Sequence, residues 1–209
     1  MDGLLIDSEP LWDEAATEIF SRYGIKLTSE QYTTTTGLRT KEFIHWWFTH
    51  FKIPLEDIDQ VEKDIIEKVT VLVLQKGKPM PGLSHIFNFF TERGYKIGLA
   101  SSSPVELINV VIDLLQIRNA LQAISSAANL MYGKPHPEVY LNCANALNSH
   151  PAQCICFEDS FNGMIAAKAA RMKCIVVPDA KNSREVKWNA ADLKIPSLQS
   201  FNELLLQSL

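Results

Sequence analysis

Apolar and polar positions follow two different rhythms along the chain, and the change falls near Lys76. Beyond that residue, short apolar runs with strand character alternate with segments of helical spacing, a pattern typical of a parallel sheet covered by helices. The predicted strands are residues 95–100, 154–157 and 174–177 with a weaker one at 120–125, and the predicted helices are residues 105–115, 137–147 and 161–171. The pattern therefore predicts an α/β core.

The first third of the chain differs, because its apolar spacing is helical and it contains no convincing strand. Helices are predicted over residues 11–23, 40–51 and 55–74, the last as one helix or two, with breaks at Gly24, Gly37 and Pro54. Residues 76–82 carry two prolines and two glycines, which suits a hinge. We expect residues 1–9 and 76–209 to form the core and residues 10–75 to form a helical insertion.

Composition narrows the class of protein. The 209 residues carry 20 Lys+Arg and 24 Asp+Glu, a net charge of −4, and 46% are hydrophobic, as in soluble globular proteins. No basic run exceeds a dipeptide, which argues against nucleic acid as the partner, and no apolar stretch approaches the roughly 20 residues of a membrane span. No signal-peptide pattern is present, so we expect a cytoplasmic protein. We also expect a monomer. The four cysteines are expected to be buried free thiols.

Two polar segments occur where ligands approach α/β proteins. Asp2-Gly3 opens the chain, and a carboxylate followed by glycine lets the backbone approach a ligand closely; a merely solvated acidic segment has the same composition. Ser101 to Ser103 follow the strand at 95–100 and precede a helix. Hydroxyl and amide groups at such a place suit a phosphate, and a helix N-cap uses the same residues. Both interpretations stay open.

Two further segments carry charge at the predicted strand ends. Lys134 lies between a glycine and a proline, and a cation on such a stiff support can neutralise a phosphate, although loop lysines are usually solvated. Glu158 and Asp159 follow the apolar strand at 154–157. Adjacent carboxylates repel each other unless a cation is present, and hard oxygen ligands suit Mg²⁺. The alternative is that Asp159 or Ser160 caps the next helix.

The order of the four segments is more specific than any one of them. They read DGLLIDSEPLW, GLASSSP, GKPHPEVYL and EDSFNGMIAAKAARM. Together they resemble the haloacid dehalogenase superfamily of phosphatases and phosphomutases, in its β-phosphoglucomutase-like branch, and are similar to bacterial hexitol phosphatases, also called 2-deoxyglucose-6-phosphate phosphatases. The resemblance covers nearly the whole chain. It implies a Rossmann-like parallel-sheet core with a helical cap inserted after the first motif.

The resemblance also implies a Mg²⁺-dependent phosphatase of small phosphorylated sugars or sugar alcohols. In the family, one aspartate attacks the phosphoryl group and a second, two positions later, acts as general acid and base. Asp2 matches the second aspartate, Ser101 would hydrogen-bond the phosphate, and Lys134 would offset its charge. The implied metal ligands are Asp2, Glu158 and Asp159.

The resemblance assigns substrate contacts as well. Ser8 and Ser102 would lie on the phosphate side, and Trp12 and Arg39 would recognise the sugar from the cap.

The first motif departs from the family pattern. That pattern is Asp-x-Asp-Gly at the end of an apolar strand, and the sequence begins at the x, with Met1. We therefore expect the nucleophilic aspartate and its strand to lie upstream of Met1. In the family this strand lies at the centre of the sheet, and without it each unpaired backbone group would cost about 1–3 kcal/mol.

Two other functions remain open from the sequence. A hexose-phosphate mutase would return the phosphoryl group to sugar instead of water. A non-catalytic chain would keep Ser101, Lys134 and Asp159 and bind a sugar phosphate without turnover.

Overall fold

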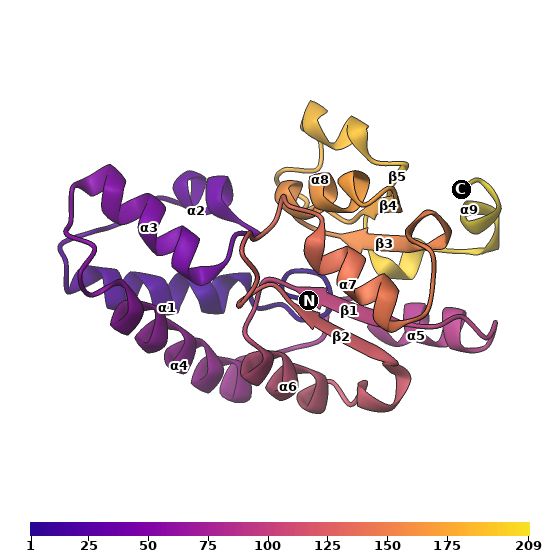
Figure 1. The fold of residues 1–209 in the computed structure, drawn as a ribbon, viewed down its shortest axis with the longest axis horizontal. Coiled ribbons are helices and arrows are strands. Elements are labelled where there is room, and N and C mark those ends of the chain that lie inside the picture. Colours follow the sequence, from indigo (N-terminus) through magenta and orange to yellow (C-terminus); the bar gives the residue numbers. More distant parts are fainter.

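Five short parallel strands and nine α-helices form the fold, and the computed structural model describes all of residues 1–209 (Figure 1). The strands are β1 Gly98–Ser101, β2 Ala123–Ser126, β3 Ile155–Glu158, β4 Lys173–Val176 and β5 Leu193–Lys194. The helices are α1 Glu9–Ser21, α2 Ser29–Thr35, α3 Thr40–Phe51, α4 Ile58–Lys76, α5 Leu83–Thr91, α6 Val105–Leu114, α7 Glu138–Ala146, α8 Phe161–Ala169 and α9 Glu203–Gln207. The α/β prediction is confirmed.

The strands form two separate parallel sheets. β1 pairs with β2, from Gly98 opposite Ala123 to Ser101 opposite Ser126, while β3, β4 and β5 pair in that order. Because β1 pairs only with β2 and β3 only with β4, each has one edge without a strand partner. Strands of both sheets line one cavity of about 1850 Å³, counting the space open to solvent, and 21 of its 28 lining residues are hydrophobic.

The helices α1 to α4 lie together to one side of the sheets (Figure 1). Helix α1 packs on α4, and α4 packs on α3. The rings of Phe20 and Phe43 stack with their centroids 5.3 Å apart, and Phe48 closes on the same cluster. No helix combines the length and the apolar character that a membrane-crossing segment needs.

Two connections join these helices to the rest of the structure, and they are bonded to each other. The Asp7 amide donates to the Lys78 carbonyl at 2.9 Å, and the Met80 amide donates to the Leu5 carbonyl at 2.9 Å. Ile6 and Pro79 form an antiparallel bridge. Residues 76–82, which the sequence predicts to be a hinge, therefore contribute one side of a short two-stranded connection.

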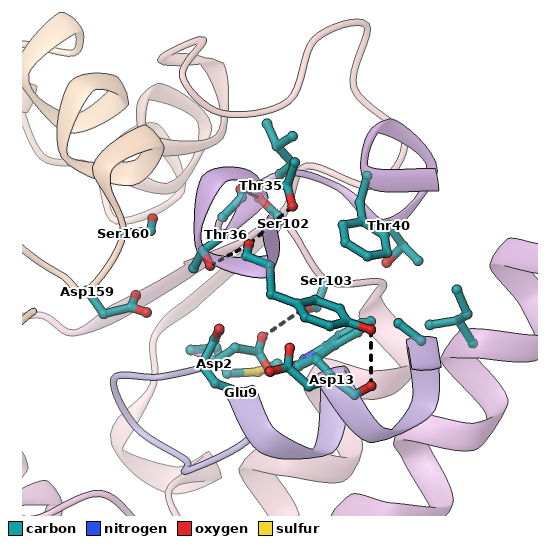
Figure 2. Close-up of a pocket in the computed structure, with 18 residues that line it drawn as sticks. Asp2, Glu9, Asp13, Thr35, Thr36, Thr40, Ser102, Ser103, Asp159 and Ser160 are labelled. Carbon is teal, nitrogen blue, oxygen red and sulfur yellow. Dashed lines mark hydrogen bonds between the residues drawn. The ribbon is translucent and has the colours of Figure 1, made fainter. Parts of the chain in front are cut away.

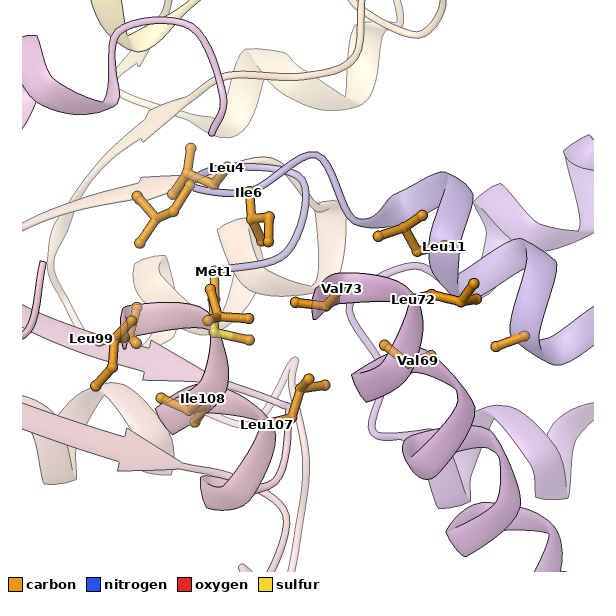
Figure 3. Close-up of a cluster of buried hydrophobic side chains, with 14 of the residues drawn as sticks. Met1, Leu4, Ile6, Leu11, Val69, Leu72, Val73, Leu99, Leu107 and Ile108 are labelled. Carbon is orange, nitrogen blue, oxygen red and sulfur yellow. The ribbon is translucent and has the colours of Figure 1, made fainter. Parts of the chain in front are cut away.

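The N-terminal segment is anchored in the apolar core (Figure 3). Met1 and Ile6 are buried, as are Leu107 and Ile108 on α6 and Val73 on α4. Burial of such side chains supplies about 1.5–3 kcal/mol each relative to exposure. Because Met1 is held in the core, the position of the adjacent Asp2 is fixed as well.

Some elements differ from the sequence prediction. The strand predicted from residue 95 begins at Gly98 in the structure, and α2, α5, β5 and α9 have no counterpart in the prediction. Helix α5 is only nine residues long, and five of its residues are buried. So short and apolar a segment shows no clear period of polar residues, and its sequence does not distinguish a helix from a strand. The four cysteines are free as predicted; three are buried and Cys154 is half-buried.

The aromatic cluster around Phe201 ties the C-terminal segment to the core. Phe201 is 0% exposed and its ring lies 5.2–5.6 Å from those of Phe89, Phe90 and Phe157. We expect Phe201→Ala to lower the free energy of unfolding by about 3–5 kcal/mol, as measured by urea denaturation. Leu204→Ala, at a position 77% exposed, is the control and should change it by less than about 0.5 kcal/mol.

Candidate active site

Three donors from two segments of the chain hold the Asp2 carboxylate. The Ser8 hydroxyl and the Trp12 indole N–H donate to Oδ1 at 2.7 and 2.9 Å, and the Ser103 hydroxyl donates to Oδ2 at 2.8 Å. Ser8 and Trp12 flank the start of α1, and Ser103 follows β1. Both carboxylate oxygens are thereby fixed at the carboxyl end of β1.

Asp159 reaches the same place from the end of β3. Gly3 has φ +64°, and a Cβ there would collide with Asp159 Oδ2, so glycine is required both by its conformation and by the close approach. Burial, and then the charge of Glu158, raise the pKa of the Asp159 carboxyl to about 7. Asp2 and Asp159 thus face one site across Gly3.

Glu158 is engaged in a buried network. Its carboxylate accepts from Lys134 Nζ at 2.5 Å, from the Tyr140 hydroxyl and from the Ser160 hydroxyl. A Cβ at Gly163 would collide with the same carboxylate. Burial raises the pKa of Glu158, but the charges of Lys134 and of the N-terminal amino group, together with the hydrogen bonds from Lys134 and Tyr140, outweigh burial and hold that pKa below its ordinary value. The network fixes the strand end that carries Asp159.

A pocket of about 800 Å³, counting space open to solvent, lies between α1, the α2–α3 segment and the strand ends (Figure 2). Asp2, Glu9 and Asp13 lie on one wall, with Asp159 and Ser160 nearby and threonine and serine hydroxyls opposite. Burial, then the charges of Asp159 and Asp2, raise the pKa of Glu9 to about 8. Burial also raises the pKa of Asp13.

The structure brings together most of the residues that the sequence singled out. Asp2, Trp12, Ser102 and Asp159 line the pocket, and Ser8 lies directly behind Asp2.

Ser101 and Lys134 lie behind the pocket lining. The Ser101 hydroxyl accepts from the Ser103 amide at 3.2 Å. Lys134 is close enough to Asp159 to lower the pKa of that carboxyl, though by less than burial raises it. Their expected roles toward phosphate stay predictions.

Two of the expected site residues have protein partners in the structure. The Glu158 carboxylate accepts from Lys134, Tyr140 and Ser160, and its expected role as a metal ligand stays a prediction. Arg39 does not line the pocket.

Arg39 instead joins the helical layer to the core. Its guanidinium donates to the Leu130 carbonyl and to Glu42, both at 2.6 Å, and its Nε has no partner. An acid three or four positions away, as Glu42 is from Arg39, is the sequence signal for the Arg39–Glu42 pair.

The sequence analysis assigned no role to Glu9 or Asp13, and it named Ser103 only as part of the serine segment after β1. Glu9 and Asp13 are four residues apart, which places them on one face of a helix. That spacing could have identified the pair, but it could not have shown which face meets the pocket.

A divalent cation fits two of the donors present. The Asp2 and Asp159 carboxyls lie on either side of Gly3, and burial and the Glu158 charge raise the pKa of Asp159, so a positive charge bound there would favour its ionised form. No group of three or more His, Cys, Asp or Glu side chains is arranged to hold a metal. The chain therefore brings together two hard oxygen ligands and not a complete set.

The parallel strands place these carboxylates at their carboxyl ends, which is where ligands bind in open α/β proteins. A family model described as haloacid dehalogenase-like hydrolase matches residues 1–177. The chain belongs to this family, and it is an enzyme of the phosphatase type.

Individual relatives agree with this assignment. The chain is 38% identical to hexitol phosphatase B of Escherichia coli over 199 residues, which are 95% of this chain and 90% of that protein. It is 26% identical to fructose-1-phosphate phosphatase of Escherichia coli, covering 85% and 93% of the two chains.

Solved structures show the same fold. CbbY from Rhodobacter sphaeroides in complex with phosphate has a TM-score of 0.88 at 23% identity, covering 100% of this chain and 96% of that one. β-Phosphoglucomutase from Clostridium difficile has a TM-score of 0.85 at 23% identity, covering 99% and 92%. The expected Rossmann-like architecture and family are confirmed.

The buried Lys134–Glu158 pair gives a testable prediction. Lys134→Met leaves the Glu158 carboxylate buried without its cation, so we expect the free energy of unfolding to fall by about 3–5 kcal/mol. Lys134→Met combined with Glu158→Gln should recover a large part of that loss, because no charge then remains buried. Urea denaturation measures both. Lys63→Met, in an exposed pair, is the control and should cost less than about 1 kcal/mol; an equal loss in the double variant would contradict the electrostatic cause.

Proposed function

We propose that this enzyme hydrolyses small phosphorylated sugars or sugar alcohols with the help of Mg²⁺. The observation that carries the proposal is the meeting of Asp2 and Asp159 at the mouth of a hydroxyl-lined pocket. Hexitol phosphatase B and fructose-1-phosphate phosphatase, both named for phosphorylated sugars or sugar alcohols, support it.

In this proposal Asp2 is the general acid and base. The sugar oxygen leaves phosphorus as an aspartate oxygen attacks, and Asp2 gives its proton to that leaving oxygen. Asp2 then takes a proton from the water that releases phosphate. The bonds from Ser8, Trp12 and Ser103 keep its carboxyl aimed at both steps.

Mg²⁺ would supply charge stabilisation for the phosphoryl group. Asp159 and the backbone carbonyl of Asp2 are the groups of this chain that would hold the ion. Lys134 would offset the negative charge that gathers at the strand ends, and Ser101 would donate to the phosphate once its hydroxyl turns away from the Ser103 amide.

The attacking aspartate is proposed to precede Met1 at the end of an apolar strand. The cavity between β1 and β3 supports this, because it is lined mainly by apolar side chains and bordered by two strands that each have an unpartnered edge. A strand there would satisfy both edges. Met1 itself lines the cavity, so a residue before Met1 would lie next to Asp2.

Helices α1 to α4 are proposed to act as a cap. The Ser102 hydroxyl donates to the Gly37 carbonyl at 2.9 Å, and Asn162 donates to the Thr36 carbonyl at 3.1 Å. These bonds join the helical layer to the strand ends directly over the pocket. The chain passes between helices α1 to α4 and the rest of the structure through two connections, which pair with each other at Ile6 and Pro79. We therefore expect the hinge there.

The metal site predicts a ligand-dependent stability. A bound cation favours the ionised form of the buried Asp159 carboxyl. Mg²⁺ at about tenfold its Kd should therefore stabilise the folded chain by ~1.4 kcal/mol and raise Tm by about 3–6 °C. Asp159→Asn should abolish this increase, whereas Asp7→Asn, at an exposed position, should keep it. Differential scanning fluorimetry gives the result. An unchanged increase in Asp159→Asn would place the cation elsewhere.

Catalysis gives a second prediction. A chain extended upstream of Met1 by its own apolar segment ending in aspartate should release phosphate from hexitol phosphates in the presence of Mg²⁺, and removal of Mg²⁺ with EDTA should stop the release. The added aspartate changed to asparagine should keep the higher Tm that strand pairing gives and lose activity by at least about 10³-fold. Turnover by the 209-residue chain, with its start at Met1 verified by intact mass, would refute the location of the nucleophile.

A further inference from the structure

The side chains that line the pocket carry carboxyl and hydroxyl groups and no positive charge, and the one cation beside them is the amino group of Met1, which lowers the pKa of Glu9. None of its 18 lining residues is Lys, Arg or His. Glu9 and Asp13 lie one turn apart on α1 and face the cavity (Figure 2), and neither carboxyl has a hydrogen-bond or ion-pair partner in the protein. The opposite wall carries the hydroxyls of Thr35, Thr36 and Ser102.

The cations nearest to the pocket are already paired. Lys134 is bound to Glu158 behind the lining. Arg39 is bound to Glu42 and to the Leu130 carbonyl. A ligand that reached the α1 wall would therefore meet no cationic side chain, and in the chain that the proposed function extends upstream the Met1 amino group is an uncharged amide.

We propose that Glu9 and Asp13 are specificity-determining residues that select substrates whose far end is an uncharged polyol and reject substrates with a second anionic group. A sugar hydroxyl can donate to a carboxylate or accept from a carboxylic acid, so it suits these groups in either state. A carboxylate or second phosphate at the same place would be desolvated beside acids with no cationic side chain to offset its charge. The inference rests on the proposed function, because it places the substrate phosphate at Asp2 and Asp159.

This selection bears on the mutase alternative. Moving a phosphoryl group from an enzyme to a sugar that already carries one produces a bisphosphate. The second phosphate would then face Glu9 and Asp13. The pocket therefore favours transfer to water.

Two matched pairs of ligands test the inference by isothermal titration calorimetry in the presence of Mg²⁺, with the upstream-extended chain whose added aspartate is changed to asparagine, so that binding is measured without turnover. Glucitol 6-phosphate and 6-phosphogluconate differ only in a terminal hydroxyl or carboxylate. Glucose 6-phosphate and glucose 1,6-bisphosphate differ in the second phosphate. We expect the neutral-ended member of each pair to bind at least about tenfold more tightly.

Variants assign the effect to the α1 wall. Asp13→Asn, and Glu9→Gln with Asp13→Asn, should each reduce the preference for the neutral-ended ligand by about threefold or more. Asp7→Asn removes the same charge at an exposed position outside the pocket and should leave the preference unchanged. Circular dichroism checks that each variant is folded, and the unaltered chain tests the selection even if a variant does not fold.

The outcomes distinguish failure of the selection at Glu9 and Asp13 from failure of the proposed function. Equal or tighter binding of 6-phosphogluconate or the bisphosphate by the unaltered chain would overturn the selection while leaving a phosphate site in place. A preference that survives in both variants would overturn the role of Glu9 and Asp13. Absence of binding by every compound, inorganic phosphate included, would overturn the proposed function and the inference with it.

Discussion

The structure depends on how it tolerates several acids at one end of its strands. Asp2, Glu158 and Asp159 lie close together, and carboxylates gathered in a partly buried region repel one another and lose hydration. Each is accommodated differently. Asp2 receives three hydrogen bonds, Glu158 receives the Lys134 ammonium, and Asp159 retains a raised pKa. The acid left without a partner is the one best placed to hold a cation.

This division of roles separates support from chemistry. The Lys134–Glu158 pair and the Tyr140 hydroxyl form a network behind the pocket, and that network sets the position of the residue that follows Glu158. Asp2 is fixed by α1 on one side and by the serine segment after β1 on the other. Movement of either element would therefore displace the general acid proposed for the reaction.

Helices α1 to α4 supply residues to the pocket as well as covering it. Glu9 and Asp13 belong to the first of these helices, so the same helix that helps to hold Asp2 through Trp12 also forms the wall against which a substrate would lie. A change in the position of α1 would alter the general acid and the substrate wall together. This coupling follows from the chain path, in which the link containing Ile6 joins the strand-end loop directly to α1.

The sequence by itself determined the class of fold, because the alternation of buried strands and helices after Lys76 is a local property of side-chain spacing. It also identified Asp2, Lys134 and Asp159, since strand-end acids and a lysine next to proline are visible as short motifs. The sequence could not show that Glu158 is paired with Lys134 or that Arg39 reaches the Leu130 carbonyl. It could not show that Glu9 and Asp13 face the site either. Those outcomes depend on which side chains meet across distant segments, and only the packing of the tertiary structure decides that.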